Sequence, residues 1–117
     1  MKAVVLSSSS KGNSTYIEMN DVKFLIDAGL GFNDIKNKLF EIGVSPDELN
    51  FIIVTHAHSD HVRSIHSFNR VYNTKIYIGK NTYNEYTKKD LIKNYVFIDD
   101  ITEIEGLNFT KIPISHD

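Results

Sequence analysis

The sequence of 117 residues has no cysteine, no tryptophan, two prolines and only two arginines, Arg63 and Arg70. The lack of cysteine excludes disulfide bonds, thiolate zinc clusters and cysteine nucleophiles, so a bound metal must be held by histidine and carboxylate groups. No apolar run approaches the roughly 20 residues that span a bilayer, and the N-terminus is typical of a strand, not of a signal peptide. These absences predict a soluble cytoplasmic protein without contact to a membrane.

The composition that remains is typical of one globular domain. Hydrophobic residues make up 41% and charged residues 24% of the chain, and the formal net charge is −2, which gives no global basic field to attract a polyanion. Lysine is abundant, so Lys88, Lys89 and Lys93 are weak evidence for a nucleic-acid surface. We expect them on the solvated face of a helix.

Strand and helix patterns alternate from residue 22 onward, which predicts an α/β fold in a single domain over residues 1–117. The polar pair Asn20-Asp21 between two β-rich runs predicts a hairpin. The expected strands are residues 2–7, 15–19, 22–27, 51–54, 75–78 and 95–98, followed by a hairpin of 101–105 and 107–114. The expected helices are residues 35–42, 62–72 and 81–93, with a helical turn at 45–48.

The segment Thr55-His56-Ala57-His58-Ser59-Asp60-His61 holds three of the five histidines directly after a buried strand. On an extended backbone His56 and His58 project to the same side and can bind one ion. Asp60 and His61, at the turn into the next helix, can present an oxygen and a nitrogen to a second ion. Imidazole and carboxylate ligands without thiolate favour Zn²⁺, with Mn²⁺ or Fe²⁺ as alternatives.

The two other histidines differ in context. His116 follows the last expected strand; a lone histidine there is more often exposed, but beside this cluster it is a candidate third ligand of the first ion. His66 lies near the apolar face of the helix expected at 62–72. We therefore expect it to pack or to face solvent instead of binding a metal.

The pattern His56-Ala57-His58-Ser59-Asp60-His61 resembles the HxHxDH motif of the metallo-β-lactamase superfamily. Within that superfamily the chain is most similar to the bacterial YycJ/WalJ-like hydrolases. The similarity includes the loop Ser7 to Ser14, the strand end Phe24 to Gly29, and Ser115-His116-Asp117. The resemblance implies the N-terminal half of an αββα sandwich, with a mixed sheet and flanking helices.

The resemblance also implies a role for each matched residue. His56, His58 and His116 would bind the first metal, and Asp60 and His61 the second, with Asp60 also taken as the catalytic carboxylate. Asp27 would support the metal loop through hydrogen bonds without touching metal. A hydroxide bridging the two ions would attack a phosphodiester, since two cations lower the pKa of a shared water.

Two departures from the family pattern bear on activity. Ser64 stands where a glycine commonly follows the motif, and the family's bridging aspartate and final histidine fall beyond Asp117, which is too close to His116 to replace them. We therefore expect an incomplete domain with weakened or absent activity of its own. A partner chain or a second copy could complete the sandwich, because half of one would expose an apolar sheet face.

The leading hypothesis is a dinuclear metal-dependent phosphodiesterase of the YycJ type, a nuclease with DNA as substrate. One alternative is a metallo-hydrolase of small molecules such as cyclic phosphates or thioesters, because the same metal core serves many substrates. Another is a noncatalytic module that retains half a site. The sequence does not identify residues that bind the substrate.

Overall fold

A mixed sheet of six strands forms the centre of the computed structural model, which describes residues 1–108. The strands follow one another across the sheet in chain order; the first three pair antiparallel and the last three join in parallel. This confirms the predicted α/β class with a mixed sheet. The strands are β1 (Lys2–Ser9), β2 (Gly12–Met19), β3 (Val22–Ile26), β4 (Phe51–Ile53), β5 (Lys75–Ile78) and β6 (Tyr95–Phe97).

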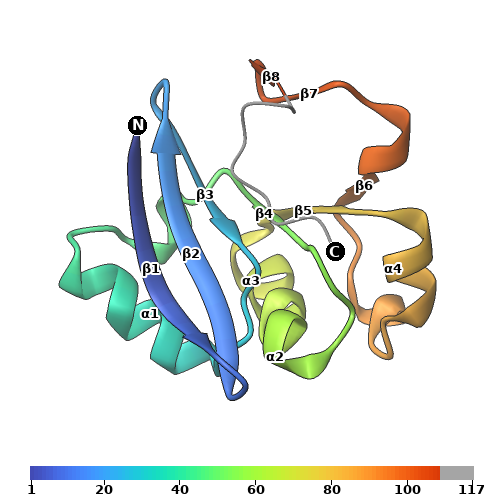
Figure 1. Ribbon diagram of the computed structural model, residues 1–117, viewed down its shortest axis with the longest axis horizontal. Coiled ribbons are helices and arrows are strands. Elements are labelled where there is room, and N and C mark those ends of the chain that lie inside the picture. The colour runs from blue at the N-terminus through green and yellow to red at the C-terminus, as the bar shows by residue number, and fades with distance from the viewer. Residues whose placement is uncertain (109–117) are drawn as a thin grey trace.

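Helices connect the parallel strands, and a small hairpin follows them. Figure 1 shows α1, α2 and α3 along the lower side of the sheet, α4 at the right and the hairpin at the top. No helix within residues 1–108 is long and apolar enough to cross a bilayer. The helices are α1 (Phe32–Glu41), α2 (Ser59–Val62), α3 (Ile65–Tyr72) and α4 (Lys80–Glu85), with 3₁₀ turns η1 (Pro46–Glu48), η2 (Lys89–Leu91) and η3 (Ile98–Asp100); the hairpin is β7 (Glu103–Ile104) and β8 (Leu107–Asn108).

Both faces of the central strands are buried, which explains why their sequences are apolar without alternation. Leu25 and Ile52 belong to the cluster formed with α1 and α3. Phe24 and Phe51 point to the opposite face, where their rings stack 4.6 Å apart and belong to one cluster with Ile104. Phe24 and Phe51 are 0% exposed, so the second face of the sheet is covered at this ring stack.

Two predicted helices are interrupted. The helix expected at 62–72 is divided into α2 and α3, because the backbone N–H of Ser64 donates to the Ala28 carbonyl, 2.9 Å away, instead of continuing a helix. The helix expected at 81–93 ends at Glu85, and only η2 follows. Tyr86 has extended dihedral angles and is buried in the core, so tertiary packing overrides the local helical preference there.

Candidate metal centre

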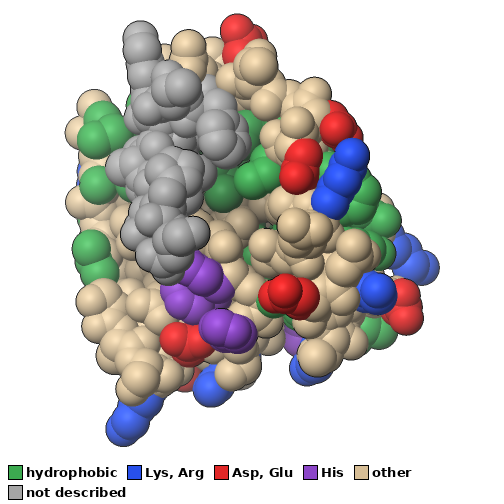
Figure 2. Space-filling view, turned by 45° about the vertical axis from the view of Figure 1, so that its right-hand side comes forward, with side chains coloured by type: hydrophobic (Ala, Val, Ile, Leu, Met, Phe, Trp, Pro, Cys, Tyr) green, Lys and Arg blue, Asp and Glu red, His purple; other side chains and the backbone are tan. Residues whose placement is uncertain are grey.

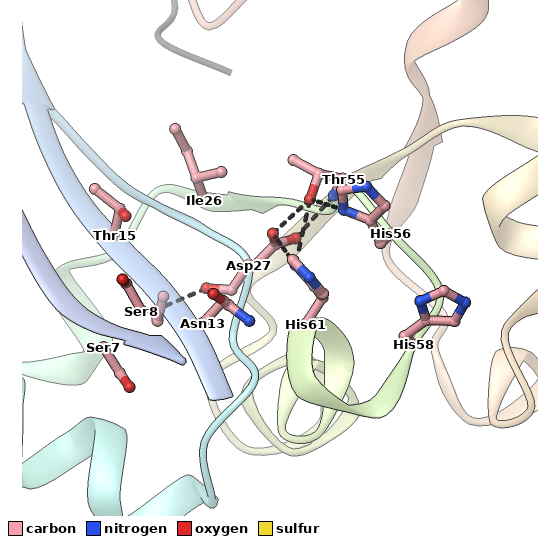
Figure 3. Close-up of a pocket in the computed structure, with 11 residues that line it drawn as sticks. Ser7, Ser8, Asn13, Thr15, Ile26, Asp27, Thr55, His56, His58 and His61 are labelled. Atoms are coloured by element: carbon pink, nitrogen blue, oxygen red, sulfur yellow. Dashed lines mark hydrogen bonds and ion pairs between the residues drawn. The ribbon is translucent and has the colours of Figure 1, made fainter. Parts of the chain in front are cut away.

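The candidate site lies where the parallel strands β3 and β4 end. Asp27 follows β3 directly, and its backbone N–H donates to the Ile53 carbonyl, 2.8 Å away, so that the two strand ends stay paired. The segment from Thr55 to His58 leaves β4 beside it, and α2 carries His61 back toward Asp27 (Figure 3). Open α/β sheets place their binding sites at this carboxyl edge, as the sequence predicted.

Asp27 is the buried centre of a hydrogen-bond network. Its Oδ1 accepts from the backbone N–H of Thr55 at 2.8 Å, and its Oδ2 accepts from the Thr55 hydroxyl at 2.5 Å and from His61 Nδ1 at 2.7 Å. The backbone of Asp27 has a φ of +63°, a left-handed conformation that aspartate tolerates better than most residues. The hydrogen bonds hold its carboxylate under the histidine loop.

The same network fixes the tautomers of two histidines. Because Asp27 is an acceptor, the proton of His61 lies on Nδ1 and the lone pair on Nε2. The Thr55 hydroxyl donates to Asp27, so it accepts from His56 Nδ1, which is 2.8 Å away. His56 therefore also carries its lone pair on Nε2. Carboxylate and hydroxyl partners on the other ring nitrogen are typical of histidines that ligate metals.

The structure brings some of the predicted ligands together more closely than others. Asp27, His56 and His61 offer ligand atoms that lie within 4.8 Å of one another, and the rings of His56 and His61 are 4.5 Å apart. The ring of the exposed His58 lies 6.5 Å from that of His56. Figure 3 shows His58 beside the network and not within it.

Asp60 faces the second nitrogen of His61. Its Oδ2 is 3.7 Å from His61 Nε2, a separation that one ion with bonds of about 2.0–2.2 Å can bridge. Asn13, the second residue of β2, donates from Nδ2 to both the backbone carbonyl and Oδ2 of Asp60, each 3.2 Å away. Gly29 packs so tightly that an added Cβ would lie 1.7 Å from the Asp60 carbonyl oxygen.

The donors fit divalent transition metals, because they are imidazole nitrogens with the Asp60 carboxylate close to one of them. The cavity measures about 470 Å³ and is lined by the imidazoles of His56, His58 and His61. Burial raises the pKa of the Asp27 carboxyl, and hydrogen bonds from Thr55 and His61 oppose that rise. With three hydrogen bonds accepted, Asp27 is better suited to orient the histidines than to bind a metal itself.

Sequence reasoning missed two contributors to this site. The motif predicts no role for Thr55 beyond preceding the first histidine, and the polar loop pattern predicts none for Asn13, yet both contact the site's carboxylates directly. The signal for Thr55 was its position between the strand and the first histidine. Nothing local pointed to Asn13, because its partner Asp60 is 47 residues away.

Three further predictions concern residues near the motif and at the chain end. His66 belongs to α3, where its Nδ1 is buried, in agreement with the expected packing role. Ser64 has a φ of −115°, so this position does not require glycine, and its hydroxyl donates to the Ala28 carbonyl at 3.2 Å. His116 and Asp117 lie outside the described residues.

The fold and the histidine-rich edge together match one family. The model of the metallo-β-lactamase superfamily matches residues 10–116, and the chain belongs to this superfamily. The structure of a B3 metallo-β-lactamase with an active-site glutamic acid superposes with a TM-score of 0.72 over 92% of this chain and 46% of the other, at 15% identity. At that identity the likeness concerns the fold alone.

Relatives of known name are more similar in sequence. The exodeoxyribonuclease WalJ of Streptococcus pneumoniae is 33% identical over 99% of this chain and 46% of its own length. The exodeoxyribonuclease YycJ of Bacillus anthracis is 28% identical over 97% of this chain and 45% of its own. The chain thus spans about half the length of the curated relatives that it matches.

Proposed function

We propose that this chain supplies the metal-binding part of a nuclease that hydrolyses phosphodiester bonds of DNA. The observation that carries the proposal is the Asp27–Thr55 network, which orients His56 and His61 in a chain similar along almost its whole length to proteins named exodeoxyribonucleases. The fold alone supports only the superfamily, because metallo-β-lactamases share it.

Within this proposal the protein holds two divalent ions, with Zn²⁺ preferred and Mn²⁺ or Fe²⁺ as alternatives. His56 and His58, with His116, hold the first ion, and Asp60 and His61 hold the second. Bound ions of this kind lower the pKa of water and neutralise charge on a phosphodiester. Asp27 and Thr55 keep the imidazoles in the tautomer that ligation requires, and Asn13 orients the catalytic carboxylate of Asp60.

The direct test uses linear DNA, single-stranded or duplex and labelled at either end, incubated with the protein and Zn²⁺ or Mn²⁺. We expect weak release of nucleotides from an end, because the chain spans about half the length of the relatives. This weak cleavage should be lost in His58→Ala and retained in His66→Gln, a matched histidine outside the proposed ligand set. Equal turnover in wild type and His58→Ala would reject the proposed role of the site.

The same assay separates the alternatives. A cyclic nucleotide and an acyl thioester serve as small-molecule substrates; faster turnover of either than of DNA would favour a small-molecule hydrolase. If a second copy completes the sandwich, the cleavage rate rises more than in proportion to the concentration of this protein. If a partner chain completes it, adding that chain raises the cleavage rate. Calorimetric titration with Zn²⁺ distinguishes two tight ions per chain from the weak single ion that a noncatalytic half-site would bind.

A further inference from the structure

A second cavity shares one wall with the candidate metal centre. It measures about 360 Å³, and the wall is the loop after β4. Successive side chains of that loop point to opposite sides: His56 and His58 line the metal cavity, whereas Ala57 and Ser59 line the second one. The two cavities therefore lie on opposite sides of the same loop. The remaining wall includes Arg63, Tyr86, Thr87 and Lys88.

The second cavity is basic. Arg63 and Lys88 line it, and no carboxylate does. Neither cation forms an ion pair within residues 1–108, although Lys23 and Lys80 on other surfaces pair with carboxylates. Because the whole chain carries a net charge of −2, two unpaired cations beside the metal loop are not the result of a general basic excess.

The basic surface continues away from the metal loop. A neighbouring cavity of about 600 Å³ is lined by Arg70 and Lys93, with Asp90 as the acidic residue on its wall. Lys88 and Arg70 both lower the pKa of His66, after the larger effect of its burial, so both cations lie close enough to act on the same imidazole. Arg63, Lys88, Arg70 and Lys93 are called the basic track below.

The basic track differs from the surface that the sequence predicted. The lysines were expected on one solvated helix, but that helix is interrupted at Tyr86. Because of the interruption, Lys88 lines the same cavity as Arg63, which lies between α2 and α3. Lys93 lines the same cavity as Arg70. Both arginines of the chain therefore belong to the track. Figure 2 shows surface imidazoles with Asp and Glu side chains beside them and separate Lys and Arg side chains below them.

We propose that the basic track binds the sugar–phosphate backbone of the DNA strand whose phosphodiester enters the metal cavity. The inference rests on the proposed nuclease function. Arginine recognises phosphate through paired N–H donors and lysine through a point charge, and such contacts hold a strand without reading its sequence. The hydroxyls of Ser59 and Thr87 add hydrogen-bonding groups in the cavity next to the metal loop.

The test measures binding without cleavage. A fluorescent single-stranded oligonucleotide is titrated with the protein in EDTA, and its anisotropy is followed at several salt concentrations. For Arg63→Ala/Lys88→Ala we expect at least about a fivefold loss of affinity at low salt, and a salt dependence whose slope is smaller by about 1.4, because each phosphate contact with a single strand contributes about 0.7.

The matched control removes the same charge from another surface. Lys36→Ala/Lys38→Ala changes two lysines of α1, which lies at the opposite side of the molecule from α4 (Figure 1). We expect its affinity and salt slope to equal those of the wild type. An equal loss in both double variants would show that net charge alone determines binding, and would overturn the proposal.

Cleavage kinetics separate this proposal from the proposed function. If both are correct, Arg63→Ala/Lys88→Ala raises KM for DNA and leaves kcat unchanged, whereas His58→Ala abolishes turnover. Wild-type binding by the track variant would overturn the track while leaving the nuclease assignment intact. Circular dichroism verifies that the double variant folds. The single variant Arg63→Lys keeps the positive charge, so it should retain most of the DNA affinity that the double variant loses.

Discussion

At the scale of single residues, Asp27 explains why the histidine loop has a defined geometry. One buried carboxylate receives hydrogen bonds from the Thr55 backbone, the Thr55 hydroxyl and His61. Hydrogen bonds to a charged group contribute about 1.5–3 kcal/mol each, and they offset the cost of burying the carboxylate. The network thus fixes the orientation of two imidazoles before any metal binds.

Thr55→Val tests the hydroxyl in that network. The variant keeps the shape of the side chain but removes the donor to Asp27 Oδ2 and the acceptor for His56 Nδ1. We expect Zn²⁺ affinity to fall about 10- to 100-fold, the usual effect of losing a partner behind a metal ligand, as measured by calorimetric titration. Thr55→Ser keeps the hydroxyl and should bind Zn²⁺ like the wild type; equal losses in both variants would exclude a role for the hydroxyl.

At the scale of elements, the site depends on close contact between the start of β2 and the loop after β3. Gly29, in the loop after β3, donates its N–H to the Asn13 carbonyl at 2.9 Å, and Asn13 in turn binds Asp60. Gly29 and the backbone carbonyl of Asp60 are so close that no side chain at position 29 fits between them. The position of Asp60 is therefore set by the start of β2 and by the loop after β3 together.

Gly29→Ala should displace the Asp60 carbonyl, because the new Cβ would lie 1.7 Å from its oxygen and 2.7 Å from the Asn13 nitrogen. We expect the free energy of unfolding to fall by about 1–3 kcal/mol, as for other overpacked sites, together with weaker metal binding. Gly79→Ala is the control, since its nearest neighbours lie 3.8 Å away. Urea unfolding of both variants measures the difference; comparable stability would contradict the close packing at Gly29.

The elements themselves were predictable to different degrees. The strands β3 and β5 were predicted at nearly their observed bounds, because a short apolar run buried on both faces is a local feature. The breaks at Ser64 and Tyr86 were not predictable, because they depend on a hydrogen bond to Ala28 and on burial against other elements. The histidine cluster was visible as a motif, whereas Asn13 was not, since its partner lies far away in the chain.

At the scale of the whole molecule, the candidate ligands of one short segment are arranged by an element far away in the chain. His56 follows β4, His61 belongs to α2, and Asp27 at the end of β3 joins them. An ion held by these groups would bind the native state more tightly than the unfolded chain, in which Asp27 does not orient the imidazoles. Metal binding and the free energy of unfolding of the chain are therefore linked.

Zn²⁺ should thus raise the free energy of unfolding of the whole chain. A ligand present at 100 times its dissociation constant stabilises the native state by about 2.7 kcal/mol when it binds the native state alone, and the shift is measured by urea unfolding with Zn²⁺ or EDTA. The increase should disappear in His56→Ala and persist in His66→Gln, whose side chain lies in α3 and outside the site. A shift that persists in His56→Ala would place the ion elsewhere, and no shift in the wild type would reject the metal centre independently of any cleavage assay.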